Sequence, residues 1–340
     1  MSTTAAPCLV TGATGLVGSR ICLDLLLAGR KVRALRRAQS DWSILHRTFA
    51  QYSSLLEEID WFIGDVTEVL SVYEALDGIE EVYHAAGLVS FDPKDRLRLY
   101  STNSQGTTNM VNMSLERGVK RFCHISSVAA IGRSEQDAVI DESVAWTNSS
   151  FNTEYAISKY EAEREVWRGI EEGLQAVIVN PSIILGPGDW EKGSGLLFRA
   201  VWNGLRFYPS GTTGFVDVRD VSLAAITLVE KREFGKRFIL NSDSIPYRTV
   251  FTEIANALGK PPVSIRVSKM LSNFAWRFEK LRCMITGASP VLTRETAHTS
   301  MGVWNYSGER LTKTTGIRCI PISQSIADWA VVFLKEHSQR

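Results

Sequence analysis

The sequence predicts an α/β protein in which a doubly wound parallel sheet is followed by a smaller C-terminal cap. Short apolar runs alternate with helix-like segments through the first half of the 340-residue chain. A cluster of glycines follows the first run, and small or polar residues follow the later ones. Strict alternation of strand and helix favours a parallel sheet with helices on both faces.

Six apolar runs of the first half indicate strands, at 7–10, 31–35, 59–63, 81–85, 121–125 and 176–179. Helical spacing of apolar residues falls between them at 16–28, 103–117 and 155–170, and Gly29 is placed to end the first helix. In a doubly wound sheet, ligands lie beyond the carboxyl ends of the strands. The residues that follow these runs, which include Asp65, Gly87, Ser127 and Asn180, should therefore gather along one edge.

The pattern changes after residue 188, where the elements become shorter and less regular. We expect residues 1–188 to form the sheet domain and 215–245 to return to it. Residues 189–214 and 246–320 would form a substrate-binding cap, and 321–340 a C-terminal helix. An amphipathic segment at 271–286 is expected to pack into the cap core; a lid or a membrane-surface helix is the alternative.

The glycine cluster reads TGATGLVG and joins the first strand to the first helix. Glycine permits a tight turn, a close approach of the backbone to a pyrophosphate, and close packing of helix on strand. The pattern therefore predicts a Rossmann dinucleotide site; a tight turn without a ligand is the alternative. Its candidate contacts are Gly12, Thr14, Gly15, Leu16, Val17 and Gly18.

The end of the second strand bears on the choice of cofactor. An acidic residue there usually holds the ribose 2′-hydroxyl of NAD, but this sequence has Arg36 and Arg37. A guanidinium can bind a 2′-phosphate, so NADP(H) is favoured over NAD(H), unless both arginines are only solvated surface charges. Asp65 and Val66 are expected beside the adenine; the alternative for Asp65 is a helix N-cap.

Tyr155 and Lys159 lie four residues apart in a predicted helix, so they share one face. A nearby ammonium favours the phenolate form of tyrosine, which otherwise has a pKa of about 10. The pair can then remove a proton from an alcohol or return one to an alkoxide. Ser127 would hold the reacting oxygen, with Ser126 as the competing residue and turn capping as the alternative role of both.

Together these residues resemble the extended short-chain dehydrogenase/reductase family, and within it the dihydroflavonol reductase and 3β-hydroxysteroid dehydrogenase branch. The matching stretches, which cover about two-thirds of the chain, are TGATGLVG, GDV, HAAG, NSQGTTN, ISSVAAIG, YAISK, NPSIILGPG and FVDVRDV. The resemblance implies Ser127 rather than Ser126 as the catalytic serine, and Asn103 as a residue that orders the active site. His84 and His124 are expected to be structural. Asn103 is counted with the catalytic residues, and further cofactor contacts are placed at Ala85, Ala86, Gly87, Asn103, Tyr155, Lys159, Asn180, Pro181 and Ser182.

The resemblance also implies a homodimer formed through two helices of each subunit, at about 97–117 and 155–170. Composition adds exclusions. A formal net charge of +1 gives no reason to expect a nucleic-acid partner. Five widely spaced cysteines favour reduced thiols over disulfides or a metal site. We find neither a signal-peptide pattern nor a long apolar run, and expect a cytoplasmic protein without a membrane span.

Three functions remain open at this point. The first is an NADP(H)-dependent oxidoreductase that acts on a small-molecule ketone or secondary alcohol through Ser127, Tyr155 and Lys159. The second is a sugar-nucleotide epimerase with tightly bound NAD, and the third is a dinucleotide-binding protein without catalysis. Dehydration is disfavoured, because Val128 and Ala129 stand where the family's dehydratases carry an acid pair.

Overall fold

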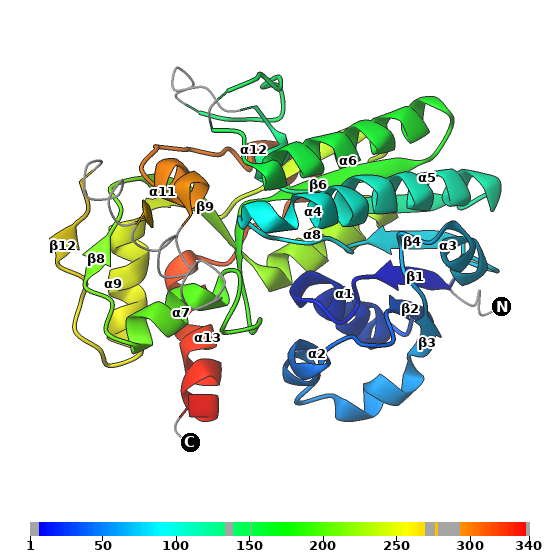
Figure 1. Ribbon diagram of the computed structural model, residues 1–340. Helices are drawn as coiled ribbons and strands as arrows, with labels where there is room; N and C mark the ends of the chain where they lie inside the picture. The colour runs from blue at the N-terminus through cyan, green and yellow to red at the C-terminus, as the bar shows by residue number, and fades with distance from the viewer. Residues whose placement is uncertain (1–6, 133–138, 150, 269–275, 278–292, 338–340) are drawn as a thin grey trace.

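The computed structural model describes residues 7–132, 139–149, 151–268, 276–277 and 293–337. At its centre is a seven-stranded sheet with the order β10-β6-β5-β4-β1-β2-β3, in which every pair is parallel (Figure 1). The strand order reverses beside β1, so the crevice for a ligand is expected there. The predicted doubly wound sheet is confirmed. Its strands are β1 (Cys8–Thr11), β2 (Val32–Arg36), β3 (Asp60–Ile63), β4 (Glu81–His84), β5 (Arg121–Ile125), β6 (Ala176–Pro181) and β10 (Lys236–Leu240).

Helices cover both faces of this sheet. One face carries α1 (Leu16–Leu27) and α8 (Val218–Glu230), which contact each other, with α2 (Ser43–Thr48), η1 (Ser53–Glu58) and α12 (Glu309–Thr315) beside them. The other face carries α3 (Val69–Ala75), α5 (Gly106–Glu116) and α6 (Glu154–Glu171). Figure 1 shows α5 and α6 side by side.

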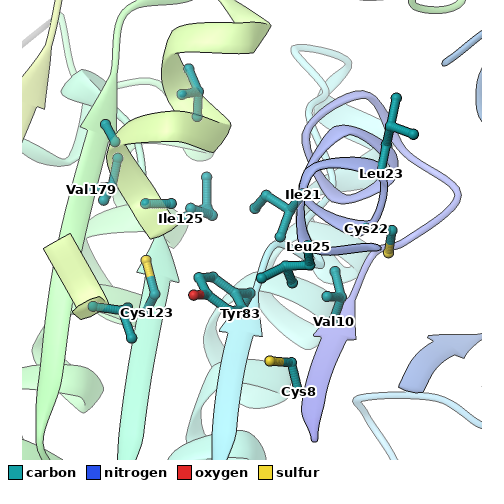
Figure 2. Packing of buried hydrophobic residues seen from close by; sticks show 14 of the residues in the cluster. Cys8, Val10, Ile21, Cys22, Leu23, Leu25, Tyr83, Cys123, Ile125 and Val179 are labelled. Atoms are coloured by element: carbon teal, nitrogen blue, oxygen red, sulfur yellow. The ribbon is translucent and has the colours of Figure 1, made fainter. Parts of the chain in front are cut away.

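The central strands are buried on both sides, which explains their continuous apolar runs. Val10 and Val179 pack with α1 and α8, whereas the residues just before them, Leu9 and Ile178, pack under α3, α5 and α6. Figure 2 shows the first of these layers, in which Tyr83 of β4 faces α1. Cys8, Cys22 and Cys123 are buried thiols of the same layer.

The helix expected at 103–117 begins earlier than the sequence pattern indicated. The chain enters it through η2 (Pro93–Asp95) and α4 (Arg96–Leu99), passes through a π-helical segment, η3 (Tyr100–Gln105), and continues as α5. Asp92 caps the start by accepting from the amide of Lys94, and Pro93 follows it. This Asp-Pro pair is a start signal that apolar spacing does not reveal. The π-helical turn places Asn103 inside the protein, where it is 1% exposed.

A second, smaller part lies beyond β6. It holds a three-stranded sheet of β7 (Ile183–Leu185), β9 (Thr212–Asp217) and β11 (Asp243–Pro246), and the short pair β8 (Phe207–Tyr208) and β12 (Ile265–Arg266). Its helices are α7 (Gly195–Trp202), α9 (Tyr247–Ala257), α11 (Arg294–Thr299) and α13 (Ile322–His337). α7, α9 and α13 enclose a separate apolar core. A 3-10 turn, η4 (Val128–Ala130), follows β5.

The segment 215–245, expected to return to the large sheet, divides between the two parts. α8 and β10 join the large sheet, whereas β9 and β11 pair with each other in the smaller one. Successive residues of β9 explain the division, because Phe215 packs in the core of the smaller part and Val216 in that of the larger. The amphipathic segment 271–286 lies outside the described residues, apart from 276 and 277. Among the helices of the described ranges, none has the length and apolar character to cross a membrane.

Candidate active site

The glycine loop turns tightly between β1 and α1, against the end of β4. Gly12 has a φ of +66°, and a Cβ placed on it would lie 2.6 Å from the carbonyl oxygen of Ala85. A Cβ on Gly18 would collide with the carbonyl oxygen of Gly12. No side chain caps α1 at Gly15, so the first amides of the helix can serve an anion. The loop has the shape that a pyrophosphate cradle requires. Its other predicted residues, all half-buried at the same turn, are Thr14, Leu16 and Val17.

The residues after β4 connect this loop to the rest of the site. The amide of Ala86 donates to Thr11 Oγ1 at 3.1 Å, which ties the end of β4 to the end of β1. A Cβ placed on Gly87 would lie 3.4 Å from Asn103 Oδ1 and 3.9 Å from Lys159 Nζ. Gly87 therefore marks the point where the predicted cofactor edge meets two predicted catalytic residues.

The two arginines after β2 lie in different surroundings. The Arg36 guanidinium is 5.0 Å from the ring centroid of Trp42 and 5.9 Å from that of Trp61. Arg37 is exposed and lines, with Asp65, a hollow of about 430 Å³ at the carboxyl ends of β2 and β3. Arg37 is therefore the guanidinium that opens onto the predicted adenosine end, while Arg36 packs on indole rings.

Asp65 and Val66 follow β3 at this end. Asp65 Oδ1 accepts from the amide and from the hydroxyl of Thr67, both at 2.9 Å, which stabilises a turn before α3, whereas the N-cap position of that helix is Glu68. Val66 is 6% exposed, and its carbonyl oxygen accepts from Asn109 Nδ2 at 3.0 Å. Both residues thus fix the course of the chain beside the hollow.

The predicted catalytic pair, Tyr155 and Lys159, lies in the first turns of α6. The Thr153 hydroxyl caps this helix, so Tyr155 falls in the first turn and Lys159 one turn further on. Lys159 is 4% exposed, and its Nζ donates to the carbonyl oxygen of Ile125 at 2.8 Å. Burial lowers the pKa of Lys159 to about 8, and the nearby Glu163 carboxylate opposes that shift. A buried ammonium is thereby held between α6 and the end of β5.

Tyr155 is half-buried, and its ring meets Phe91 edge-on with 5.7 Å between centroids. Ser127 is the N-cap of η4, after β5, and its Oγ accepts from the amide of Ala129 at 3.1 Å. Ser126 is 6% exposed, whereas Ser127 is half-buried. Of the two serines, Ser127 is the more exposed.

Asn103 clamps the loop after β4 to α6. Its Oδ1 accepts from the amide of Leu88 at 2.7 Å, and its Nδ2 donates to the carbonyl oxygen of Leu88 at 3.0 Å. The same Nδ2 donates to Ser158 Oγ at 2.9 Å. Asn103 therefore orders the backbone on one side and the helix of Tyr155 and Lys159 on the other.

Asn180, at the end of β6, reveals residues that sequence reasoning missed. Its Nδ2 donates to the carbonyl oxygen of Ser127 at 3.0 Å and to a carboxylate oxygen of Glu163. Glu163 is 2% exposed, and its other carboxylate oxygen lies 3.5 Å from Arg237 Nη1. Its spacing of four residues from Lys159 was the available signal, since both must share one helix face.

The remaining predicted residues lie where β6 ends. Pro181 is buried as the last residue of β6, and the amide of Ser182 donates to the carbonyl oxygen of Leu240 at 2.9 Å. Leu16 reaches across to Gly186, where an added Cβ would lie 2.7 Å from Leu16 Cδ1. The strand ends thus bring most predicted residues to one edge of the sheet, where the strand order reverses beside β1.

This arrangement can be compared with known proteins. A sequence model of the NAD dependent epimerase/dehydratase family matches residues 8–241, which is most of the chain. The chain belongs to this family. Its members are NAD(P)-dependent reductases, dehydrogenases and epimerases, so the chain is an enzyme of the oxidoreductase type and the family resemblance seen in the sequence is confirmed.

Two curated relatives and one solved structure illustrate the range of this family. The "Putative dihydroflavonol 4-reductase" of Synechocystis sp. is 30% identical over 335 residues, covering 96% of this chain and 94% of its own. The "Sterol demethylase protein B" of Methylococcus capsulatus is 31% identical over 259 residues, covering 74% of this chain and 75% of its own. The crystal structure of gox2253 is 27% identical with a TM-score of 0.81, and 98% of each chain is covered.

Proposed function

We propose that this member of the NAD-dependent epimerase/dehydratase family is an NADP(H)-dependent oxidoreductase that interconverts a ketone and a secondary alcohol. The observation that carries the proposal is the buried ammonium of Lys159, one helical turn from Tyr155 and 2.8 Å from the carbonyl oxygen of Ile125. Burying a charge is costly, and buried ionisable groups with a strongly shifted pKa cluster at functional sites. An ammonium beside a phenol stabilises the phenolate.

The residues divide the proton work between them. A bound nicotinamide would supply hydride to the carbonyl carbon, or accept it from the alcohol carbon. Tyr155 gives its hydroxyl proton to the carbonyl oxygen during reduction and takes a proton from the alcohol during oxidation. Lys159 favours the phenolate that remains, and Ser127 orients the reacting oxygen. Asn103 positions α6 through Ser158.

The cofactor would lie along the carboxyl edge of the sheet. Support comes from Gly12, whose missing Cβ leaves room beside Ala85, and from the uncapped start of α1. Arg37 would contact a 2′-phosphate, with Arg36 held on its indole rings behind it. We include the other predicted contacts in the proposed site, namely Asp65, Val66, Ala86, Gly87, Asn180, Pro181 and Ser182.

Calorimetric titration of the stripped protein with NADPH and NADH tests the cofactor. We expect NADPH to bind about tenfold more tightly, as a charge-assisted contact to the 2′-phosphate allows. Arg37→Ala should remove that preference and leave NADH binding unchanged. Arg36→Ala is the matched comparison and should have the smaller effect. Preference for NADH in the native chain would overturn the NADP(H) proposal.

An epimerase with tightly bound NAD is the second candidate, and the family to which the chain belongs is named for that activity. NAD that leaves the purified protein only on unfolding would favour it. Elimination chemistry has less support, because Val128 and Ala129 are buried apolar residues beside Ser127 and neither can transfer a proton.

Two further features are proposed with this function. The smaller part, with its own apolar core, would bind the small-molecule substrate over the cofactor.

A homodimer would form through α4, η3, α5 and α6, since Leu97 and Tyr100 are 80% and 54% exposed on that surface and Ile157 is 36% exposed. Size-exclusion chromatography tests the dimer, and Leu97→Glu should convert it to a monomer.

A further inference from the structure

A series of buried hydrogen bonds, here called the relay, runs through His84 from Thr11, beside the glycine loop, to Asn103. Thr11 Oγ1 lies 2.8 Å from His84 Nδ1, and His84 Nε2 lies 3.0 Å from Thr107 Oγ1. The Thr107 hydroxyl donates to the carbonyl oxygen of Asn103 at 2.6 Å. At the other end, Thr11 Oγ1 accepts from the amide of Ala86. Each residue of the relay, namely Thr11, His84, Thr107 and Asn103, is at most 1% exposed.

Only one assignment of donors and acceptors satisfies all the hydrogen bonds of the relay. Thr107 uses its hydroxyl proton on the carbonyl oxygen of Asn103, so toward His84 it can only accept. His84 must therefore carry its proton on Nε2. A neutral imidazole then has a bare Nδ1, which accepts the hydroxyl proton of Thr11.

The surroundings keep His84 neutral. Burial lowers its pKa to about 3, and the Lys159 ammonium acts in the same direction. The ring of His124, also fully buried, stacks on it with 5.4 Å between centroids. A neutral ring with one fixed tautomer is a rigid spacer between two hydroxyl groups.

We propose that His84, as the Nε2–H tautomer, is a positioning residue that couples the cofactor loop to the helix of Asn103. One end of the relay fixes Ala86, beside the glycine loop. The other end fixes the backbone of Asn103, whose side chain holds Leu88 and Ser158. The functional meaning of this coupling rests on the proposed function; its physical existence does not.

Nitrogen NMR of the histidine rings tests the tautomer. The chain has five histidines, so selective labelling gives few signals. At neutral pH we expect the His84 signals of a protonated Nε2 and an unprotonated Nδ1. A protonated Nδ1, or an imidazolium, overturns the proposal.

Hydrogen exchange of the Ala86 amide tests the coupling. Thr107→Val removes a hydroxyl three hydrogen bonds away, and we expect exchange at Ala86 to quicken by about threefold to tenfold, as the loss of one hydrogen bond allows. Thr107→Ser restores the hydroxyl and should return the rate to within about twofold of the native value. Thr108→Val is the matched control, because its hydroxyl bonds only the carbonyl oxygen of Ser104.

The outcomes separate the relay from the proposed function. Equal Ala86 exchange in Thr107→Val and Thr108→Val overturns the relay, whatever the protein binds. If exchange at Ala86 quickens in Thr107→Val but the native protein binds neither NADPH nor NADH, the relay is supported and the proposed function is overturned. Where NADPH binds, Thr107→Val should weaken it by about threefold, whereas a purely local role would leave binding unchanged.

Discussion

Polar residues play opposite roles at the two ends of the strands of the large sheet, called here the amino edge and the carboxyl edge. At the amino ends of β1, β4 and β5, charges neutralise one another within the protein. Glu81 is fully buried, lies 3.1 Å from Arg30 and 2.8 Å from Arg121, and accepts from the Tyr83 hydroxyl at 2.8 Å. Cys8 Sγ also donates to it. This edge is a closed ion cluster that joins three strands.

At the carboxyl ends of the same three strands the polar groups are instead hydroxyls, a neutral imidazole and the ammonium of Lys159. β1 ends on Thr11 and the glycine loop, β4 ends on His84, and β5 ends on Ile125, whose carbonyl oxygen holds the Lys159 ammonium. Under the proposed function, the same strands provide stability at one edge and chemistry at the other, as expected of doubly wound sheets.

The largest effect should follow removal of the ammonium at the carboxyl edge. Lys159→Met should lower turnover by about 10²–10⁴-fold, because the phenolate of Tyr155 loses its stabilising charge. Steady-state kinetics with a ketone substrate measure this loss. Lys120→Met, at an exposed lysine of the amino edge, is the control and should keep native turnover. Similar losses in both variants would remove the distinction between the edges.

At the amino edge the expected effect is on stability. Glu81→Gln leaves two arginines facing an uncharged amide, and we expect unfolding to become easier by about 3–5 kcal/mol. Glu80→Gln breaks only the exposed pair with Lys120 and should cost about 0–1 kcal/mol. Urea unfolding measures both. An unchanged midpoint in Glu81→Gln would contradict the account of this edge.

Two glycines with nearly equal φ separate backbone strain from crowding. Gly12→Ala adds a Cβ against Ala85, while Gly29→Ala, at a φ of +71°, meets nothing within 4 Å. Gly29→Ala should cost about 1 kcal/mol, as a left-handed alanine does. Gly12→Ala should cost more and weaken dinucleotide binding by at least about tenfold, by closing the cradle. Thermal unfolding measures the loss of stability, and calorimetric titration measures the dinucleotide affinity. Equal effects of Gly12→Ala and Gly29→Ala would contradict a role of Gly12 in dinucleotide binding.

A smaller effect concerns pH. Because burial lowers the pKa of Lys159 to about 8, its ammonium is lost as pH rises through that value, and ketone reduction should fall there. The Glu163 carboxylate raises the pKa of Lys159, so Glu163→Gln should move this fall to lower pH. Rate profiles between pH 6 and 10 for the two proteins test this prediction, and a fall at the same pH in both would contradict the role of Glu163.

Most of the fold could be predicted from the sequence, because strands that are buried on both faces give continuous apolar runs. The division of β9 between two cores was not predictable in this way, since Phe215 and Val216 look equally apolar. The glycine loop and the Tyr155–Lys159 spacing are local patterns, which one sequence can show. The contact of Thr11 with His84 spans 73 residues and depends on strand order, so it became visible only in the folded chain.

In the proposed function, Tyr155 transfers the proton that accompanies hydride transfer. Its most direct test is ketone-dependent oxidation of NADPH by the native protein and by Tyr155→Phe at matched cofactor occupancy. We expect turnover of Tyr155→Phe to fall by about 10²–10⁴-fold, with cofactor affinity within about twofold of native. Full turnover in Tyr155→Phe would contradict it.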